Sequence, residues 1–151
     1  AGQLPLDVEA IGCDLLSATG RKYLRGPRGT GFRHVRRALP ERLTPPFLDM
    51  HGARWAASDR FEMRSDARRF ENLEFNYAAV IGLGVAVDCA RAWGLEATES
   101  RVMKLAEDLR IRLGRLPGVT VRDLAARRCG LVTFTLDGIE PREATLRLRE
   151  R

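Results

Sequence analysis

The longest apolar stretch of the chain runs from Tyr77 to Trp93 and carries few charges. Small and branched apolar residues fill it, and Gly82 and Gly84 in its middle permit another segment to approach closely. An apolar run of this length with no polar face predicts a helix that is buried on all sides. Gly94 follows directly and predicts the end of this helix.

A second helix is predicted over residues 98–113, where apolar residues recur at spacings of three and four. These residues are Val102, Leu105, Ala106, Leu109 and Leu113. Thr98 or Ser100 is expected to cap its start, and Gly114 its end. Lys104 lies on this helix beside acidic residues and is interpreted as an ordinary solvated side chain.

Short apolar runs predict four strands, and turn residues bound most of them. The predicted strands are Cys13–Ser17, Thr30–Val35, Val119–Arg122 and Leu131–Leu136. A helical turn is expected over Val8–Ile11, and a helix is expected to begin at Pro141. Residues 38–68 are rich in proline and predict a loop, whose tip His51–Trp55 is polar and aromatic together. Such a tip is suited to reach a ligand or a partner chain, although a packed loop explains it equally well.

The order of these elements predicts an α/β chain. The long loop followed by two helices suggests that the last ~50 residues form a separate lobe of ordinary domain size. We therefore expect one domain over residues 1–96 and a smaller one over residues 97–151. The chain begins without an initiator methionine, and its last predicted helix stops without a glycine cap. These ends are expected for a piece of a longer protein.

The composition of the chain narrows the range of functions that we expect. The chain of 151 residues is 44% hydrophobic and 30% charged, with a formal net charge of +6. No run reaches the roughly 20 apolar residues of a membrane span, so no membrane partner is expected. Because the arginines are spread along the chain among acids, the basic balance makes nucleic-acid binding an unlikely role.

Three widely separated cysteines make a zinc site or a disulfide framework unlikely, and no metal site is expected. They are interpreted as reduced thiols of a cytoplasmic protein.

The rarity of lysine draws attention to one segment. The chain has 26 basic residues, of which only Lys22 and Lys104 are lysines. A guanidinium stays protonated, whereas a lysine amine that is desolvated or placed near another cation can act as a nucleophile towards an aldehyde. Arg21 and Arg25 flank Lys22, and a glycine-rich turn follows.

The same segment also offers groups for an anion. Thr19 supplies a hydroxyl, the arginines supply guanidinium groups, and the glycines supply backbone N–H groups that approach closely. A buried amine beside an oxyanion pocket fits an aldehyde cofactor that carries a phosphate, and pyridoxal 5'-phosphate is the obvious candidate. A plain glycine-rich turn is the alternative interpretation.

Residues Asp14–Phe32 resemble the cofactor-lysine segment of the class V aminotransferase family. This family includes cysteine desulfurases, selenocysteine lyases, isopenicillin-epimerase-like proteins and sulfoxide-lyase-like enzymes. The resemblance covers most of the chain, and its other segments are Gly2–Val8, Arg69–Glu71, Ile81–Gly84, Leu116–Val119 and Leu131–Leu136.

The resemblance implies the type I PLP-dependent transferase fold, in part: the end of the large domain and part of the small C-terminal domain. It implies that Lys22 forms the internal aldimine with PLP and moves protons at the substrate's α-carbon, and that Thr19 and Arg21 contact the cofactor phosphate. It further implies a homodimer that acts on a small-molecule amino-acid substrate as a carbon–sulfur lyase or a transaminase.

The chain departs from the family pattern at two places, and both count against a cysteine desulfurase. Many relatives carry histidine where this chain has Arg21. Asn72–Tyr77 replaces the glycine-threonine that many desulfurases have at that point. The resemblance implies that the cysteine nucleophile of desulfurases lies after the point where this chain ends, and that Cys13, Cys89 and Cys129 do not occupy its position. The alternative function is a small binding module that uses Arg33, Arg36 and Arg37 on phosphate backbones. The 151 residues alone are not expected to catalyse a reaction.

Overall fold

A computed structural model describes residues 1–123 and 125–150 of the chain. Its contacts divide the chain into two compact units. Unit one consists of residues 6–92 together with Ala1, and unit two consists of residues 2–5 together with the chain from Trp93 onward. Each unit is described by itself.

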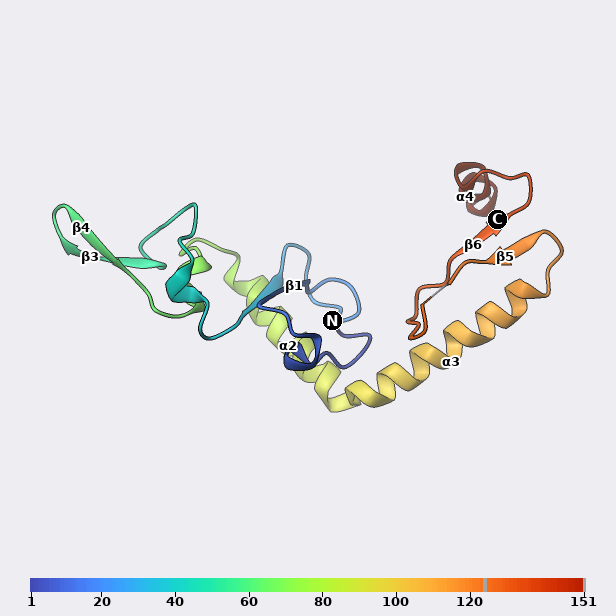
Figure 1. The fold of residues 1–151 in the computed structure, drawn as a ribbon, viewed down its shortest axis with the longest axis horizontal. Coiled ribbons are helices and arrows are strands. Elements are labelled where there is room, and N and C mark those ends of the chain that lie inside the picture. The colour runs from blue at the N-terminus through green and yellow to red at the C-terminus, as the bar shows by residue number, and fades with distance from the viewer. Residues whose placement is uncertain (124, 151) are drawn as a thin grey trace. The chain divides into compact units, whose positions relative to one another are not determined.

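Unit one contains three short helices, two antiparallel hairpins and one long helix (Figure 1). In chain order these are α1 (Val8–Ile11), β1 (Leu15–Thr19), β2 (Gly31–Val35), η1 (Pro40–Arg42), β3 (Ala53–Ala57), β4 (Arg60–Met63), η2 (Ala67–Phe70) and α2 (Tyr77–Trp93).

The first hairpin confirms the two strands predicted near the start of the chain. β1 pairs with β2 in an antiparallel register that runs from Leu15 opposite Val35 to Thr19 opposite Gly31. β1 therefore begins two residues later than predicted and extends as far as Thr19. The segment that contains Lys22 becomes the connection between two paired strands.

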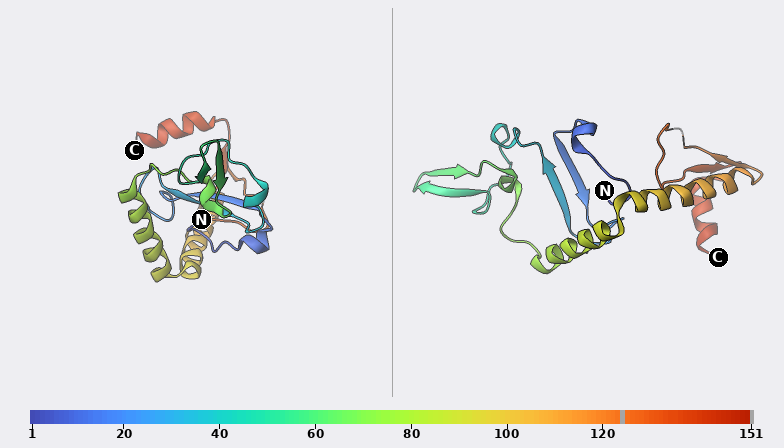
Figure 2. Two further views of the ribbon diagram at one scale, coloured as in Figure 1. Left: turned by 90° about the vertical axis from the view of Figure 1, so that its left-hand side faces the viewer. Right: turned by 90° about the horizontal axis from the view of Figure 1, so that it is seen from below.

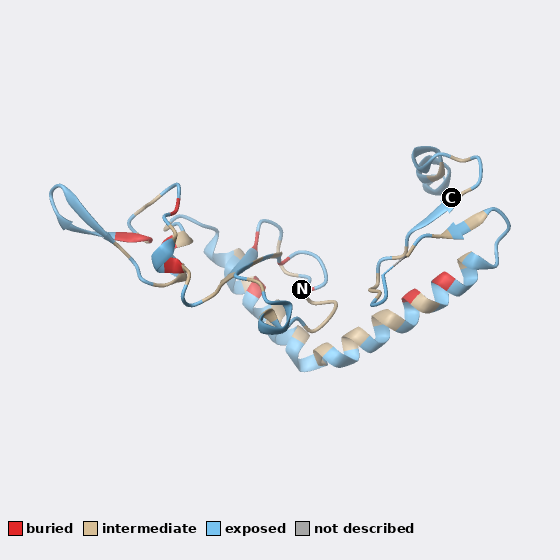
Figure 3. Cartoon of the chain, viewed as in Figure 1, coloured by how far each residue is buried: buried red, intermediate tan, exposed pale blue. Residues whose placement is uncertain are grey.

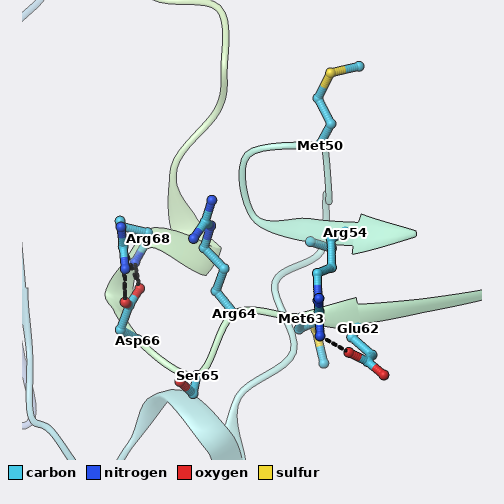
Figure 4. A pocket seen from close by; sticks show the side chains of 9 residues that line it. Met50, Arg54, Glu62, Met63, Arg64, Ser65, Asp66 and Arg68 are labelled. Atoms are coloured by element: carbon cyan, nitrogen blue, oxygen red, sulfur yellow. Dashed lines mark hydrogen bonds and ion pairs between the residues drawn. The ribbon is translucent and has the colours of Figure 1, made fainter. Parts of the chain in front are cut away.

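The prediction of a loop over residues 38–68 is wrong in part, because the second hairpin lies within it. β3 and β4 pair with Arg54 opposite Glu62 and Trp55 opposite Phe61. Arg54 and Glu62 form an ion pair at 2.7 Å (Figure 4), and a cross-strand pair of opposite charge stabilises a hairpin. The predicted loop tip His51–Trp55 thus leads into a strand, with the Trp55 side chain 74% exposed.

Two charged side chains fix the base of the β3–β4 hairpin. Arg69 is 5% exposed and donates to the carbonyl oxygens of Pro40, Leu43 and Arg64. Asp49 accepts hydrogen bonds from the backbone N–H groups of Leu73, His51 and Gly52. These bonds, that of Leu73 first, lower the pKa of Asp49, because they stabilise its ionised form. The hairpin is therefore anchored to segments on both sides of it in the sequence.

The structure confirms helix α2 but not its burial on all sides. Only Leu83 of this helix is buried, whereas Ile81 is 70% and Val85 59% exposed (Figure 3). The reason is that the described residues cover one face of α2 only, where it meets the β1–β2 hairpin (Figures 1 and 2).

Unit two contains α3 (Leu95–Gly114), β5 (Val119–Val121), β6 (Phe134–Leu136) and α4 (Pro141–Arg149). β5 and β6 form an antiparallel pair in which Thr120 lies opposite Thr135. The predicted helix at Pro141 is confirmed. The predicted strand over residues 131–136 is shorter, since only its last three residues pair with β5.

The predicted caps of the second long helix are wrong. α3 begins at Leu95 and its N-cap is Gly94, whose φ of 86° turns the chain between the two helices. The Thr98 hydroxyl donates to the Gly94 carbonyl from inside the first turn, at 3.0 Å, instead of capping the helix start. Gly114 is the last helical residue, and Arg115 is the C-cap.

A buried ion pair organises unit two. The Arg110 side chain is 4% exposed and its Nε lies 2.6 Å from the Asp123 carboxylate, which is 9% exposed. Arg110 also donates to the carbonyl oxygens of Cys129 and Leu131. The Thr133 hydroxyl and backbone N–H donate to the same aspartate at 2.7 and 2.9 Å. This network holds the segment between β5 and β6 against α3.

Within the described ranges, neither α2 nor α3 alone has the length and hydropathy of a membrane span; only the two consecutive helices taken together reach them.

We predict that Asp123→Asn destabilises the protein in a pH-dependent way. Thr133 and then Arg110 lower the pKa of Asp123 to about 2, below the ~3.9 of an unfolded aspartate. A lowered pKa stabilises the fold fully above ~pH 4, and this contribution is lost as the pH falls through about 2. Urea unfolding at a series of pH values should show that the variant has a lower free energy of unfolding than the wild type, and that this difference narrows as the pH falls through this range.

The matched control is Asp108→Asn. Asp108 pairs with Arg112 at 3.0 Å, but both side chains are more than half exposed. Exposed ion pairs contribute about 0–1 kcal/mol to stability. The free energy of unfolding of this variant should therefore stay close to that of the wild type at every pH. An Asp123→Asn gap of equal size at pH 2.5 and pH 6 would contradict the prediction.

Candidate functional site

The candidate site is the connection between β1 and β2, residues 20–30, which we call the lysine turn. Backbone hydrogen bonds close it: the Gly20 N–H donates to Thr30, and the Gly26 N–H donates to Gly20, each at 2.8 Å. The Arg25 N–H donates to the Lys22 carbonyl at the same distance. Lys22 therefore lies in a tight turn inside a larger loop that is closed at both ends.

These bonds correct one expectation drawn from the sequence. The glycine-rich turn from Gly26 to Gly31 was expected to offer its N–H groups to an anion, but the Gly26 N–H already donates to the Gly20 carbonyl. Gly20 and Gly26 instead allow Leu83 of α2 to pack closely against the turn. An ideal Cβ on Gly20 would lie 2.6 Å from the Leu83 Cδ1, and one on Gly26 would lie 2.8 Å from the same atom.

Helix α2 therefore supports the lysine turn through Leu83. Leu24 and Thr30, at 7% and 9% exposure, are buried on the same turn, and the Thr30 hydroxyl donates to the Pro27 carbonyl at 2.6 Å. An internal hydrogen bond satisfies this buried hydroxyl, as buried polar groups require. The inner side of the turn is thus fixed by packing and by its own hydrogen bonds.

The three predicted site residues lie on the outer side. Thr19 ends β1, Arg21 and Lys22 follow in the turn, and all three are exposed. The structure therefore brings the three residues into one short stretch, but it does not bury the amine as expected. The reason is that the turn meets α2 at Gly20 and Gly26, which leaves Arg21 and Lys22 between these two contacts uncovered.

The side chains of Thr19, Arg21 and Lys22 have no hydrogen-bond or ion-pair partner among the residues that the structure describes. A hydroxyl, a guanidinium and an amine in one stretch form a donor set for an anionic ligand that also carries an electrophilic carbon.

Backbone strain marks the same turn. Arg25 has a φ of 60°, the left-handed region that non-glycine residues rarely adopt. Such conformations persist where the surrounding structure enforces them, and they cluster at functional sites. Sequence reasoning missed this feature, because arginine carries no signal for a left-handed backbone.

The second segment of the family resemblance approaches the same hairpin. A hollow of about 340 Å³ is lined on one side by β1 and β2, including Ser17 and Arg33, and on the other by Ala67, Phe70 and Glu71. The Arg69–Glu71 segment and the lysine hairpin, about 50 positions apart in the sequence, are therefore neighbours.

Arg36, one of the three arginines in the alternative hypothesis of a phosphate-backbone binder, is already paired within unit one. Arg36 donates to Asp14 at 2.7 Å, to Glu9 at 2.9 Å and to the Cys13 carbonyl at 3.2 Å. Its guanidinium is neutralised by two carboxylates, which raise the pKa of Arg36. This arginine ties β2 to the segment before β1, so it is not presented to a phosphate backbone.

Comparison with known proteins identifies the family. The model of the class-V aminotransferases matches residues 1–151, and the chain belongs to this family. A probable cysteine desulfurase of Xylella fastidiosa is 34% identical over 136 residues, which are 88% of this chain and 32% of that protein. A probable hercynylcysteine sulfoxide lyase of Mycobacterium tuberculosis is 32% identical over 133 residues, 87% of this chain and 32% of the relative.

Solved structures agree on the fold. The cystine C–S lyase C-DES, solved in complex with its reaction product cysteine persulfide, superposes with a TM-score of 0.86 at 26% identity. The match covers 99% of this chain and 40% of that one. A lysine-to-alanine mutant of C-DES, with glycine covalently linked to the PLP cofactor, gives a TM-score of 0.87. The chain therefore has part of the type I PLP-dependent transferase fold and spans about a third of the length of the curated relatives it matches.

We predict that Gly31→Ala disturbs the lysine hairpin. An ideal Cβ on Gly31 would lie 2.4 Å from the Ala18 carbonyl oxygen, and a backbone atom cannot move aside as a side chain can. Overpacking of this kind costs about 1–3 kcal/mol, which denaturant unfolding would measure. Gly84→Ala is the matched control, because no described atom lies within 4 Å of its Cβ position. Alanine in a helix should stabilise it by about 1 kcal/mol; equal effects of the two variants would contradict the prediction.

Proposed function

We propose that the protein binds pyridoxal 5'-phosphate, with Lys22 as the residue that holds the cofactor's aldehyde carbon. The observation that carries the proposal is the donor set of the lysine turn. Thr19, Arg21 and Lys22 are exposed together in a member of the class-V aminotransferase family, on a turn that α2 supports from behind.

The residues of the turn fit this cofactor. An amine is the group that condenses with an aldehyde, and a guanidinium with a hydroxyl is a donor set for phosphate oxygens. The described residues leave these three side chains without competing partners. The fit rests on these side chains, and the N–H groups of Gly20 and Gly26 do not add to it, since they already donate within the turn.

Lys22, Arg21 and Thr19 each have a separate proposed role. When bound, PLP stabilises negative charge at a carbon of the substrate. Lys22 then moves the proton at the substrate's α-carbon, because an amine can both accept and donate it. Arg21 holds the phosphate and takes no part in proton transfer, since a guanidinium stays protonated. Thr19 donates its hydroxyl to the same phosphate.

The substrate proposed is a small amino acid, and the reaction a carbon–sulfur bond cleavage, with transamination as the alternative. Relatives named cysteine desulfurase and hercynylcysteine sulfoxide lyase support a carbon–sulfur lyase. The departures at Arg21 and at Asn72–Tyr77 favour a branch other than the desulfurases.

We predict that the full protein that carries this chain takes up PLP, on the order of one equivalent per chain, and then shows the visible absorbance band of a lysine-bound cofactor. Lys22→Ala should abolish this band, because no amine remains in the turn to hold the aldehyde. Absorbance spectra recorded during titration with PLP provide the measurement.

Lys104→Ala is the control for this variant. Lys104 is an exposed lysine of α3, in the other unit of the chain. Its replacement removes the same charge and should leave the band unchanged. A band that survives Lys22→Ala, or that is lost equally in both variants, would overturn the assignment of Lys22.

We further propose that the protein is a homodimer of the cytoplasm. Its three cysteines are free, which fits a reducing compartment. Exposed aromatic side chains at Trp55 and Phe61 supply apolar area for an interface. Light scattering coupled to size exclusion should give twice the mass of one chain, and the mass of a single chain at micromolar concentration would exclude the dimer.

A further inference from the structure

The Thr30 side chain lies at the base of the lysine turn, where the two ends of the turn meet. Its hydroxyl donates to the Pro27 carbonyl at 2.6 Å. The backbone carbonyl of Thr30 accepts the Gly20 N–H at 2.8 Å. Thr30 is therefore bonded to the second half of the turn through its side chain and to the first half through its backbone. Gly20, its backbone partner, closely precedes Lys22 in the sequence.

Pro27, which accepts the hydroxyl of Thr30, is packed against helix α2. An ideal Cβ on Gly82 of this helix would lie 3.0 Å from the Pro27 Cγ, which is tighter than ordinary van der Waals contact. The proline ring thus lies directly on the helix, at a residue without a side chain. Because closely packed groups have little room to move, the ring is a fixed point for the turn. A path of contacts then leads from α2 through Pro27 and Thr30 to Gly20.

The stretch between Pro27 and Thr30 has little besides this hydroxyl to fix its shape. Gly29 has a φ of 80°, and no described atom lies within 4 Å of its Cβ position. Glycine has more backbone freedom than any other residue, so a turn built on it is ordered only where contacts restrict it. The bond from the Thr30 hydroxyl to the Pro27 carbonyl spans Gly29 and restricts the backbone on both sides of it.

Burial makes the Thr30 hydroxyl difficult to replace. Thr30 is 9% exposed. The loss of one partner from a buried hydrogen bond leaves the other without compensation from water, which costs more than the bond itself contributes. The hydroxyl oxygen also lies close to Gly20, since an ideal Cβ on that glycine would be 2.7 Å from the Thr30 Oγ1. A change at this oxygen therefore reaches the start of the turn that carries Lys22.

We propose that Thr30 is a positioning residue for Lys22, an inference that rests on the proposed function of that lysine. The Thr30 hydroxyl fixes the turn, and the turn fixes the place of the amine relative to Thr19 and Arg21. Thr19 pairs with Gly31, so the strands hold it in place. Lys22 lies beyond the last paired residue, and its place depends on the turn. Thr30 acts through the backbone, because its own side chain is buried on the inner side of the turn.

The experiment compares Thr30→Val with Thr30→Ser in the full protein that carries this chain. Valine keeps the branched shape and loses the hydroxyl, whereas serine keeps the hydroxyl. Absorbance titration with PLP gives the dissociation constant and the pH at which the band of the lysine-bound cofactor titrates. In Thr30→Val, the dissociation constant should rise on the order of tenfold, because the buried Pro27 carbonyl loses this donor. The band should also titrate at a different pH, because the surroundings of the Lys22 nitrogen change. Thr30→Ser should keep both values close to those of the wild type.

Thr98→Val is the matched control. The Thr98 hydroxyl also donates to a backbone carbonyl, that of Gly94 at 3.0 Å, but it lies in α3 in the other unit of the chain. This variant loses a comparable bond and should leave the PLP affinity and the pH dependence of the band unchanged. Urea unfolding of all variants measures the loss of stability separately. A purely structural role of Thr30 would lower stability without moving the titration of the band.

A second measurement needs no cofactor. Amide hydrogen exchange in peptides that cover residues 20–30 should be faster in Thr30→Val than in the wild type, on the order of tenfold, whereas Thr30→Ser should exchange like the wild type. If the wild type takes up no PLP, the proposed function fails, and this exchange alone decides on Thr30. The two failures are therefore distinguishable.

Two results would refute the role of Thr30. One is wild-type behaviour of Thr30→Val, in PLP affinity and pH dependence where PLP binds, or in amide exchange where it does not. The other is an equal effect of Thr30→Val and Thr30→Ser, since the hydroxyl would then not be the cause. If Thr30→Val does not fold, Thr30→Ala takes its place, because it differs from Thr30→Ser only in the hydroxyl.

Discussion

The geometry of the lysine turn depends on one close contact, that between Leu83 of helix α2 and the two glycines at positions 20 and 26. Side chains at either glycine would collide with Leu83. Glycine at both positions lets the helix approach this closely, and the turn itself closes with Gly26 donating to Gly20 and Gly20 donating to Thr30. The strand before the turn and the strand after it meet in register, and Arg21 and Lys22 lie exposed between the two glycines, whereas Leu24 is buried. The position of Lys22 follows from packing behind it and not from any bond that its own side chain makes.

Three arginines join segments of the chain to one another. Arg36, Arg69 and Arg110 each donate to several oxygens of segments far apart in the sequence. A planar guanidinium with five donors can bind several acceptors at once, whereas an ammonium acts as a point charge. Burial of Arg69 and Arg110 is compensated by backbone carbonyls and, for Arg110, by the Asp123 carboxylate, although one terminal nitrogen of Arg110 has no hydrogen-bond partner among the described residues. Short elements with few apolar contacts are held together in this way.

The sequence predicted the elements that depend on local pattern. The helix over Tyr77–Trp93, the helical turn at Val8–Ile11 and the first hairpin follow from apolar runs and turn residues, and the structure confirms them. It did not predict the β3–β4 hairpin, because an ion pair and an aromatic pair across strands are visible only once the register is known. The start of α3 was misplaced, since Gly94 turns the chain before Thr98 can act as a cap. For the site, residue chemistry led to Thr19, Arg21 and Lys22. Their exposure and the use of the glycine N–H groups depend on tertiary contacts that no local pattern encodes.

Because Lys22 is exposed, its amine lacks the desolvated environment that the proposed reaction with an aldehyde requires. Amine chemistry with an aldehyde needs an environment that favours the uncharged form, which comes from desolvation or from neighbouring cations. Arg21 and Arg25 are neighbours in the sequence, but the described residues leave the outer side of the turn open to water. The proposed function would therefore require a further surface to cover this side and desolvate the amine, and such a cover would also strengthen the contacts proposed between Thr19, Arg21 and a phosphate. The described residues set the position of the amine but not its desolvation.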